Sequence, residues 1–105
     1  MVAQVTARSR GEVQGHCPFC ARSLALTFHH LIPRKVHRRP RFRRRYDAAE
    51  LARGVYCCRD CHDAIHATYP EMELASRLNS PAALAQDAAL QRHFAWLARQ
   101  RRAPG

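Results

Sequence analysis

Alternating apolar and polar residues predict two short strands in the first half of the chain. Leu24, Leu26 and Phe28 alternate with small or polar residues, which is the period of a strand with one buried face. Beyond a break at Gly54, the run Val55–Cys57 has the composition of a second strand. A long connection separates the two strands.

The second half of the chain predicts helices. A helix is expected to begin near Cys61, because His62, Ile65 and His66 then lie on one face at positions i, i+3 and i+4. Pro70 interrupts this helix. Strands followed by helices give an α+β fold.

Further helical segments follow. Residues 71–78 can continue as a helix, and Ser80-Pro81 is a helix start, with Ser as the N-cap and Pro in the first position. The final helix is expected to carry an apolar stripe of Leu90, Phe94 and Leu97.

The charge of the chain indicates a polyanionic partner. Its 105 residues include 18 Lys and Arg against 8 Asp and Glu, a formal net charge of +10. All but one of the basic residues are Arg, whose guanidinium forms paired hydrogen bonds with phosphate. Nucleic acid is therefore the first expectation. A structural protein of the ribosomal type would share this charge but would not need clustered Cys and His.

Basic residues concentrate in the connection between the strands. Residues 34–45 contain no acid and show no convincing period, so we expect a long loop, followed by one helical turn over Asp47–Arg53. A solvated charged surface is the plainer interpretation, but we expect this stretch to bind the DNA backbone. Its basic residues are Arg34, Lys35, Arg38, Arg39, Arg41, Arg43, Arg44 and Arg45.

Two cysteine pairs predict a structural zinc site. Cys17 and Cys20, like Cys58 and Cys61, are separated by two residues, so each pair can present two thiolates from one turn. Buried or redox-active cysteines are the alternative. Cys57 can in principle replace Cys58, but it breaks the spacing, and we expect it to be a small buried apolar residue.

Histidines predict a second metal site. His62 and His66 share a helix face, and His29 can join them if the zinc draws the strands beside that helix. Three protein ligands leave positions open for water and a phosphate oxygen, as in catalytic sites. His30 should project away from His29 and remain free to activate water. A second structural zinc on His62 and His66 is the alternative.

These motifs resemble the HNH, or His-Me finger, nuclease family. The resemblance rests on Cys17–Cys20, His29–Pro33 and Cys58–His66, and it is greatest to small stand-alone bacterial HNH proteins. It implies a ββα-metal core held together by the four-cysteine zinc site, with a C-terminal helical extension. The implied arrangement is one domain over 1–105, with a lead-in (1–15), the core (16–69) and the extension (70–105).

The resemblance also implies roles for the histidines. His29, His62 and His66 would bind one catalytic divalent metal, and His30 would be the general base. From the imidazole ligands themselves, we expect Mn²⁺, Co²⁺, Ni²⁺ or Zn²⁺ to bind well and Mg²⁺ to bind more weakly. The products would be a 3′-hydroxyl and a 5′-phosphate. The family often has an Asn on the second strand, which is absent here, so its bracing role is either unfilled or taken by another residue such as Tyr56 or Asp47.

The expected function is metal-dependent DNA endonuclease, a phosphodiester hydrolase. Alternatives are a zinc-dependent nucleic-acid-binding module without cleavage, an RNA-directed enzyme, and an accessory subunit of a larger nuclease. The start of the chain lacks the apolar run of a secretory signal, and no stretch is long enough to span a membrane, so we expect a cytoplasmic protein.

Overall fold

The computed structural model describes residues 13–100 and shows a small α+β fold, which confirms the predicted class. Most of the expected lead-in, residues 1–12, and residues 101–105 lie outside this part. A three-stranded antiparallel sheet has the order β1-β2-β3, formed by Val13–His16, Ser23–His30 and Gly54–Cys58. Both predicted strands are present, and β2 is longer than the alternation indicated.

Strand β1 falls partly in the stretch that the sequence assigned to a lead-in, so that assignment was wrong for its last residues. Val13 pairs with Leu26, and His16 pairs with Ser23. This edge strand has four residues, and none of them is fully buried. A strand with so little apolar content is stabilised by pairing with its neighbour, and its own residues leave no hydrophobic pattern to detect.

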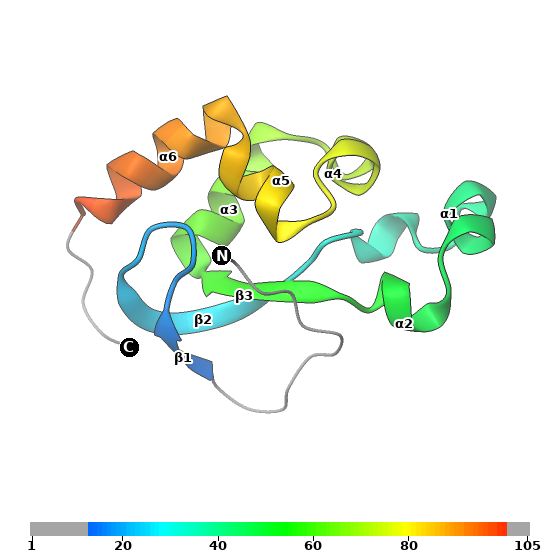
Figure 1. Ribbon diagram of the computed structural model, residues 1–105, viewed down its shortest axis with the longest axis horizontal. Coiled ribbons are helices and arrows are strands. Elements are labelled where there is room, and N and C mark those ends of the chain that lie inside the picture. The colour runs from blue at the N-terminus through cyan, green and yellow to red at the C-terminus, as the bar shows by residue number, and fades with distance from the viewer. Residues whose placement is uncertain (1–12, 101–105) are drawn as a thin grey trace.

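The helices lie in two segments of the chain, one between β2 and β3 and one after β3. Between β2 and β3 lie the 3₁₀ turn η1 and the short helices α1 and α2, and after β3 come α3 to α6. In Figure 1, α3 to α6 lie on one side of the sheet, whereas α1 and α2 lie beyond one end of β2 and β3. Their bounds are Arg34–Val36 (η1), Pro40–Arg45 (α1), Ala48–Leu51 (α2), Arg59–Thr68 (α3), Glu71–Arg77 (α4), Pro81–Gln86 (α5) and Ala88–Ala98 (α6).

The expectation of a long loop over 34–45 was wrong, because two apolar residues anchor this basic stretch. Val36 and Phe42 are 4% and 3% exposed and pack with Ile32 and with Ala75 of α4 in a small second core. Pro40 begins α1 at a position where its fixed φ suits a helix. Two buried residues in twelve are too few to reveal a period among so many arginines.

The other helix boundaries follow from capping side chains. α3 begins at Arg59, two residues before the predicted start, because the Cys58 thiol accepts a hydrogen bond from the Cys61 backbone. Ser80 caps α5 as predicted. The expected final helix is divided, since Asp87 caps a new helix, α6, by accepting from the backbone of Leu90.

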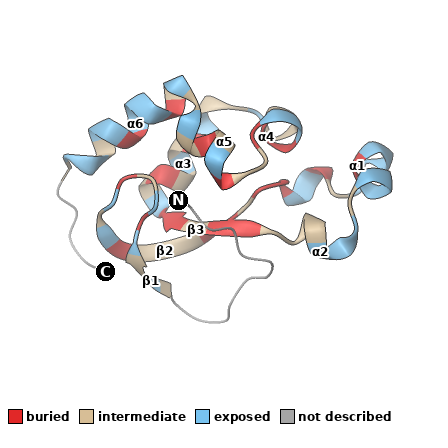
Figure 2. Cartoon of the chain, in the orientation of Figure 1, coloured by how far each residue is buried: buried red, intermediate tan, exposed pale blue. Residues whose placement is uncertain are grey.

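The main core lies between the sheet and α3 to α6. β3 is the most thoroughly buried strand, whereas α1 is exposed along most of its length (Figure 2). Of the predicted stripe on the final helix, Leu90 and Phe94 are buried in this core and Leu97 packs against its edge. None of the helices among residues 13–100 is both long and apolar enough to cross a membrane.

A glycine at the start of β3 is required by close packing, and this gives a first prediction. A Cβ on Gly54 would lie 2.3 Å from Phe28 Cζ and 2.5 Å from the His29 carbonyl oxygen. Gly54→Ala should therefore lower the free energy of unfolding by about 1–3 kcal/mol, the usual cost of overpacking. Gly15→Ala is the control, because its Cβ would meet only Leu26 at 3.6 Å. Thermal melts in which both variants lose the same stability would contradict the prediction.

Candidate metal centres

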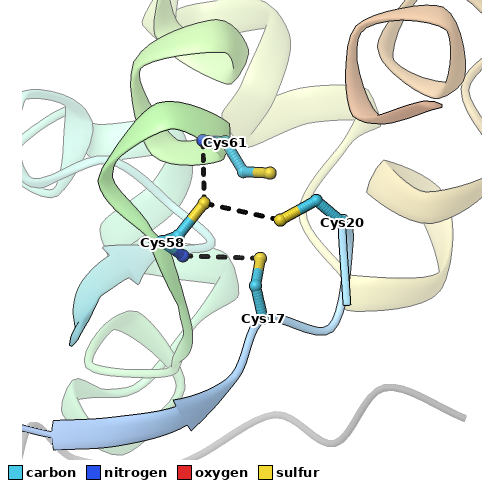
Figure 3. A group of neighbouring side chains, drawn as sticks. All are labelled: Cys17, Cys20, Cys58 and Cys61. Atoms are coloured by element: carbon cyan, nitrogen blue, oxygen red, sulfur yellow. Dashed lines mark hydrogen bonds between the residues drawn. The ribbon is translucent and has the colours of Figure 1, made fainter. Parts of the chain in front are cut away.

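Four cysteine thiols meet where the hairpin contacts the start of α3. Cys17 and Cys20 come from the turn after β1, Cys58 ends β3, and Cys61 lies in the first turn of α3. All four are buried, and their sulfurs lie within 4.8 Å of one another. Figure 3 shows the side chains directed toward a common centre. The structure thus brings together the four residues that the sequence predicts as zinc ligands.

The spacing of the sulfurs fits a tetrahedral zinc ion. Cys20 Sγ and Cys58 Sγ are 3.7 Å apart. A Zn–S bond of about 2.3 Å gives a tetrahedron with edges of roughly 3.8 Å. Backbone amides of Cys58 and Cys61 also donate to Cys17 Sγ and Cys58 Sγ, at 3.4 Å each. These donors favour thiolates, which are the form that binds metal.

Ionisation of the thiols is strongly interdependent. Hydrogen bonds from the side chains of Cys58 and Cys61 lower the pKa of Cys17 to about 3. The hydrogen bonds of Cys61 with Cys17 and Cys58 raise its own pKa. The surroundings thus favour a thiolate at Cys17 and oppose one at Cys61, and a bound cation would favour the thiolate form of both. The cluster can hold a structural metal such as zinc.

Cys57 is outside the cluster, as the spacing predicted. It is fully buried, and burial raises the pKa of its thiol, which therefore remains protonated. Its backbone carbonyl has a separate use, because it accepts a hydrogen bond from the Thr27 hydroxyl at 3.2 Å.

Arg22 contacts the thiols and was not identified from the sequence. Its guanidinium donates to Cys20 Sγ at 3.2 Å and to Cys58 Sγ at 3.5 Å, and it forms an ion pair with Asp60 at 3.2 Å. Although burial opposes the charged form, the hydrogen bond and charge of Cys20 raise the pKa of Arg22. Arg22 partly neutralises the negative charge of a four-thiolate metal site. The only signal in the sequence is its position two residues after Cys20.

Three histidines form a second group beside the sheet. His29 near the end of β2 lies against His62 and His66 of α3, with ring centroids 5.1 Å and 5.2 Å away, and the two helix rings are 5.0 Å apart. One nitrogen from each can lie within 4.8 Å of the others. The near-equal spacing places three imidazoles around one point, as predicted from the helix period and the hairpin.

His29 indicates that this point is suited to a cation. It is fully buried, and neither ring nitrogen has a hydrogen-bond partner among residues 13–100. Burial, followed by the charges of His62 and His66, lowers the pKa of His29 to about 3, so its ring is neutral and has a lone pair. An unsatisfied buried imidazole is costly, and a bound metal would remove that cost.

Thr27 fixes the tautomer of His62. Because the Thr27 hydroxyl donates its proton to the Cys57 carbonyl, its oxygen must accept from His62 Nδ1, 2.8 Å away. Nδ1 of His62 therefore carries the proton, and Nε2 is the free ligand atom. Burial, with the charge of His66, lowers the pKa of His62 to about 4, so this neutral form persists below neutral pH. Sequence analysis missed Thr27, since one Thr in a strand carries no motif.

A pocket of about 240 Å³ adjoins the histidine group. His30 lies outside the group of possible ligands but lines this pocket beside His62 and His66. Its ring packs edge-on against Phe28 at 4.9 Å. The pocket is also lined by Pro33, by the acid Glu71, and by Arg34 and Lys35, which are two of the predicted DNA-binding residues.

All eight predicted DNA-binding residues are exposed on η1, α1 and the turn between them. Lys35 forms an ion pair with Glu71 of α4 at 3.8 Å. The other seven are arginines that form no ion pair within the described part of the chain: Arg34, Arg38, Arg39, Arg41, Arg43, Arg44 and Arg45.

Asp47 and Tyr56, the two residues named from the sequence for a bracing role, lie at the start of α2 and in β3. Asp47 is exposed and caps α2 instead, by accepting from the Glu50 amide. Tyr56 packs on Phe28, with ring centroids 5.3 Å apart. The backbone amide of Leu31 donates to the Arg53 carbonyl at 3.1 Å, which fixes the chain directly after His30.

Histidines discounted in the sequence have local contacts. His16 lies 3.0 Å from the Ser23 hydroxyl, and His93 is exposed on α6. His37 is closer to the pocket than expected: its Nε2 donates to the Ile32 carbonyl at 2.5 Å, and its ring lies 5.9 Å from that of His30.

Comparison with known proteins finds one relative that spans most of the chain. Over 90 residues, the sequence is 34% identical to the Bacillus subtilis protein named "Uncharacterized protein YisB", a match covering 85% of this chain and 79% of that protein. No family model matches the sequence, and no solved structure matches it.

The cysteine cluster predicts different results at two adjacent positions. Cys58→Ala removes a ligand atom and should abolish both stoichiometric zinc and the cooperative thermal transition, because zinc binding supplies folding free energy. Cys57→Ala should retain one zinc per chain and lose roughly 1 kcal/mol, a typical cost for a point mutation. Zinc content by atomic absorption and thermal melts measure both. Zinc retained by Cys58→Ala would show that the ligand set is wrong.

The Thr27 hydrogen bond predicts an effect on the second centre alone. Thr27→Val keeps the shape of the side chain but frees the His62 tautomer, so affinity for Mn²⁺ should fall by about 10- to 100-fold. Thr68→Val is the matched control, since that hydroxyl donates only to the Ala64 carbonyl, at 2.6 Å. Calorimetry on zinc-loaded samples gives both affinities. Equal affinities for the two variants would contradict the assigned role.

Proposed function

The chain belongs to the same protein family as YisB of Bacillus subtilis, and from its two groups of possible metal ligands we propose that it is a metal-dependent DNA endonuclease of the HNH type. In this proposal the four cysteines hold a structural zinc. His29, His62 and His66 hold one catalytic divalent metal. The sheet strands β2 and β3 together with α3 form the ββα-metal core.

One observation carries the proposal: a group of three imidazoles lies beside a pocket that contains a separate histidine and two basic residues. His29, fully buried, is the innermost of the three, and exposure increases from His62 to His66. The pocket lies on that exposed side, where His62 and His66 form part of its wall. Such a site has three protein ligands and open positions, which is the pattern of a catalytic rather than a structural metal.

His30 has the position of a general base. It lines the pocket but is not one of the three ligands, so its imidazole can take a proton from water that attacks phosphorus. Phe28 packs against the ring and limits its orientations. The bound metal would supply Lewis-acid stabilisation of the charge that develops on the phosphate and leaving oxygens.

Arg34 and Lys35 are suited to holding the phosphodiester. They line the same pocket on η1, directly before the exposed arginines of α1. Glu71 also lines the pocket and partly neutralises Lys35, which leaves Arg34 as the stronger phosphate ligand. These contacts position a nucleic-acid backbone and carry no sequence information, so cleavage with little sequence preference is expected.

The ligand set influences which metals bind. Imidazole nitrogens favour Mn²⁺, Co²⁺, Ni²⁺ and Zn²⁺, whereas Mg²⁺ favours oxygen ligands and should bind more weakly. Tight binding does not ensure turnover, since a strongly held Zn²⁺ can block the open positions.

The proposal predicts that metal binding and cleavage can be separated. His30→Ala should reduce nicking of supercoiled plasmid by about 10²- to 10⁴-fold, the contribution of a general base, while the affinities for Mn²⁺ and DNA stay the same. His62→Ala should lose the metal and the cleavage together. His93→Ala on α6 is the control for removal of an exposed imidazole, and it should cleave like the unaltered chain.

The outcomes distinguish the alternatives. Undiminished nicking by His30→Ala would overturn the assignment of the base. Binding without nicking in any divalent metal would favour a zinc-dependent binding module. Cleavage of RNA but not DNA under the same conditions would identify an RNA-directed enzyme.

A further inference from the structure

A second pocket lies between α1 and the end of α4, away from the histidines. Its volume is about 400 Å³, within the range of pockets that bind small ligands. It shares no lining residue with the pocket beside His30. Its walls come from α1 and from the chain around the end of α4, and the lining residues are Arg41, Phe42, Arg45, Tyr46, Ala75, Ser76 and Asn79.

The guanidinium groups of this pocket are oriented before any ligand binds. Arg41 lies over the Phe42 ring at 5.0 Å and donates to the Ser76 hydroxyl at 2.7 Å, and Arg45 lies over the Tyr46 ring at 5.7 Å. Neither arginine forms an ion pair among residues 13–100, and no acidic residue lines the pocket. Two ordered, unneutralised guanidiniums favour an anion such as a phosphodiester.

Asn79 adds a group that can recognise a base. Its amide nitrogen donates to the Ala75 carbonyl at 2.8 Å and lies 3.4 Å from the Tyr46 hydroxyl. Because the nitrogen is engaged, the carbonyl oxygen of the amide is left as an acceptor, and no donor in the described part of the chain uses it. Each of Arg41 and Arg45 has one guanidinium face against an aromatic ring, and the opposite faces supply flat surfaces on which a base can stack.

From this combination we propose that the pocket binds one unpaired nucleotide of a nucleic-acid strand, with its phosphate on Arg41 and Arg45 and its base beside Tyr46 and Asn79. This inference rests on the proposed function for the identity of the polymer. It goes beyond that function by giving the chain a site for a base, where the exposed arginines alone would contact phosphates only.

The distance between the two pockets fits one strand passing through both. Glu71, the first residue of α4, lines the pocket beside His30, whereas Ala75, Ser76 and Asn79 near its other end line the second pocket. The seven residues of α4 span about 10 Å at ~1.5 Å per residue. One strand can therefore pass along α4 and reach both pockets.

The test separates base recognition from charge. Fluorescence anisotropy on the zinc-loaded chain, without added divalent metal, compares a labelled thymidine octanucleotide with an octamer of abasic residues. Because stacking and base contacts contribute substantially to affinity in such sites, the affinity for the abasic strand should be lower by about fivefold or more. Arg41→Gln/Arg45→Gln should lose this preference and bind both strands alike, because these guanidiniums hold the phosphate in the pocket and offer the faces on which its base stacks.

A matched variant controls for the loss of charge. Arg43→Gln/Arg44→Gln also removes two positive charges from α1, but from exposed residues that do not line the pocket. It should weaken binding of both strands yet keep the preference for the strand with bases. Thermal melts of both variants exclude unfolding as the cause.

The failure of this inference is distinguishable from that of the proposed function. An equal preference in both double variants, or no preference in the unaltered chain, would overturn the nucleotide site. Hydrolysis of bis(4-nitrophenyl) phosphate by the unaltered chain with Mn²⁺ tests the nuclease separately, because that substrate has no base to bind. A chain that discriminates between the strands but hydrolyses nothing would retain the nucleotide site and lose the nuclease.

Discussion

The convergence of four thiols on one point is the constraint from which the rest of the structure follows. Cys17 and Cys20 lie in the turn between β1 and β2, while Cys58 and Cys61 lie more than thirty-five residues later, where β3 becomes α3. A metal bound there fixes the hairpin against the helix and closes a long intervening loop. For so short a chain, such a link supplies folding free energy that a small core provides only in part.

Arg22 extends this constraint into the surrounding structure. A tetrahedral zinc with four thiolates has a net negative charge, which is unfavourable to bury without a compensating cation. Arg22, in the turn between β1 and β2, supplies that cation. Its ion pair with Asp60 connects this turn to the first turn of α3. A further hydrogen bond to the Gln100 carbonyl, at 3.4 Å, reaches the segment after α6. One side chain thus joins the metal centre to both ends of the helical layer.

The sequence predicted those features that a short local pattern encodes. Two matched pairs identified the cysteines, the helix period placed His62 with His66, and Ser80-Pro81 marked the start of α5. Features that depend on distant neighbours were missed. β1 exists because β2 pairs with it, and α1 forms because Phe42 reaches Ala75, more than thirty residues away. Thr27 and Arg22 acquire their roles only when the strand and helix meet, so neither stands out in the sequence.

The two candidate metal centres are coupled because one short segment serves both. Cys58 and Cys61 contribute thiols to the first centre, and His62, the next residue along, contributes to the second. The Cys57 carbonyl determines which way the Thr27 hydroxyl points, and that hydroxyl sets the tautomer of His62. Any shift of this segment by a fraction of a bond length moves His62 relative to His29, which is fixed in β2. The cysteine group therefore fixes the position of His62 relative to the other two histidines without contributing an atom to their group.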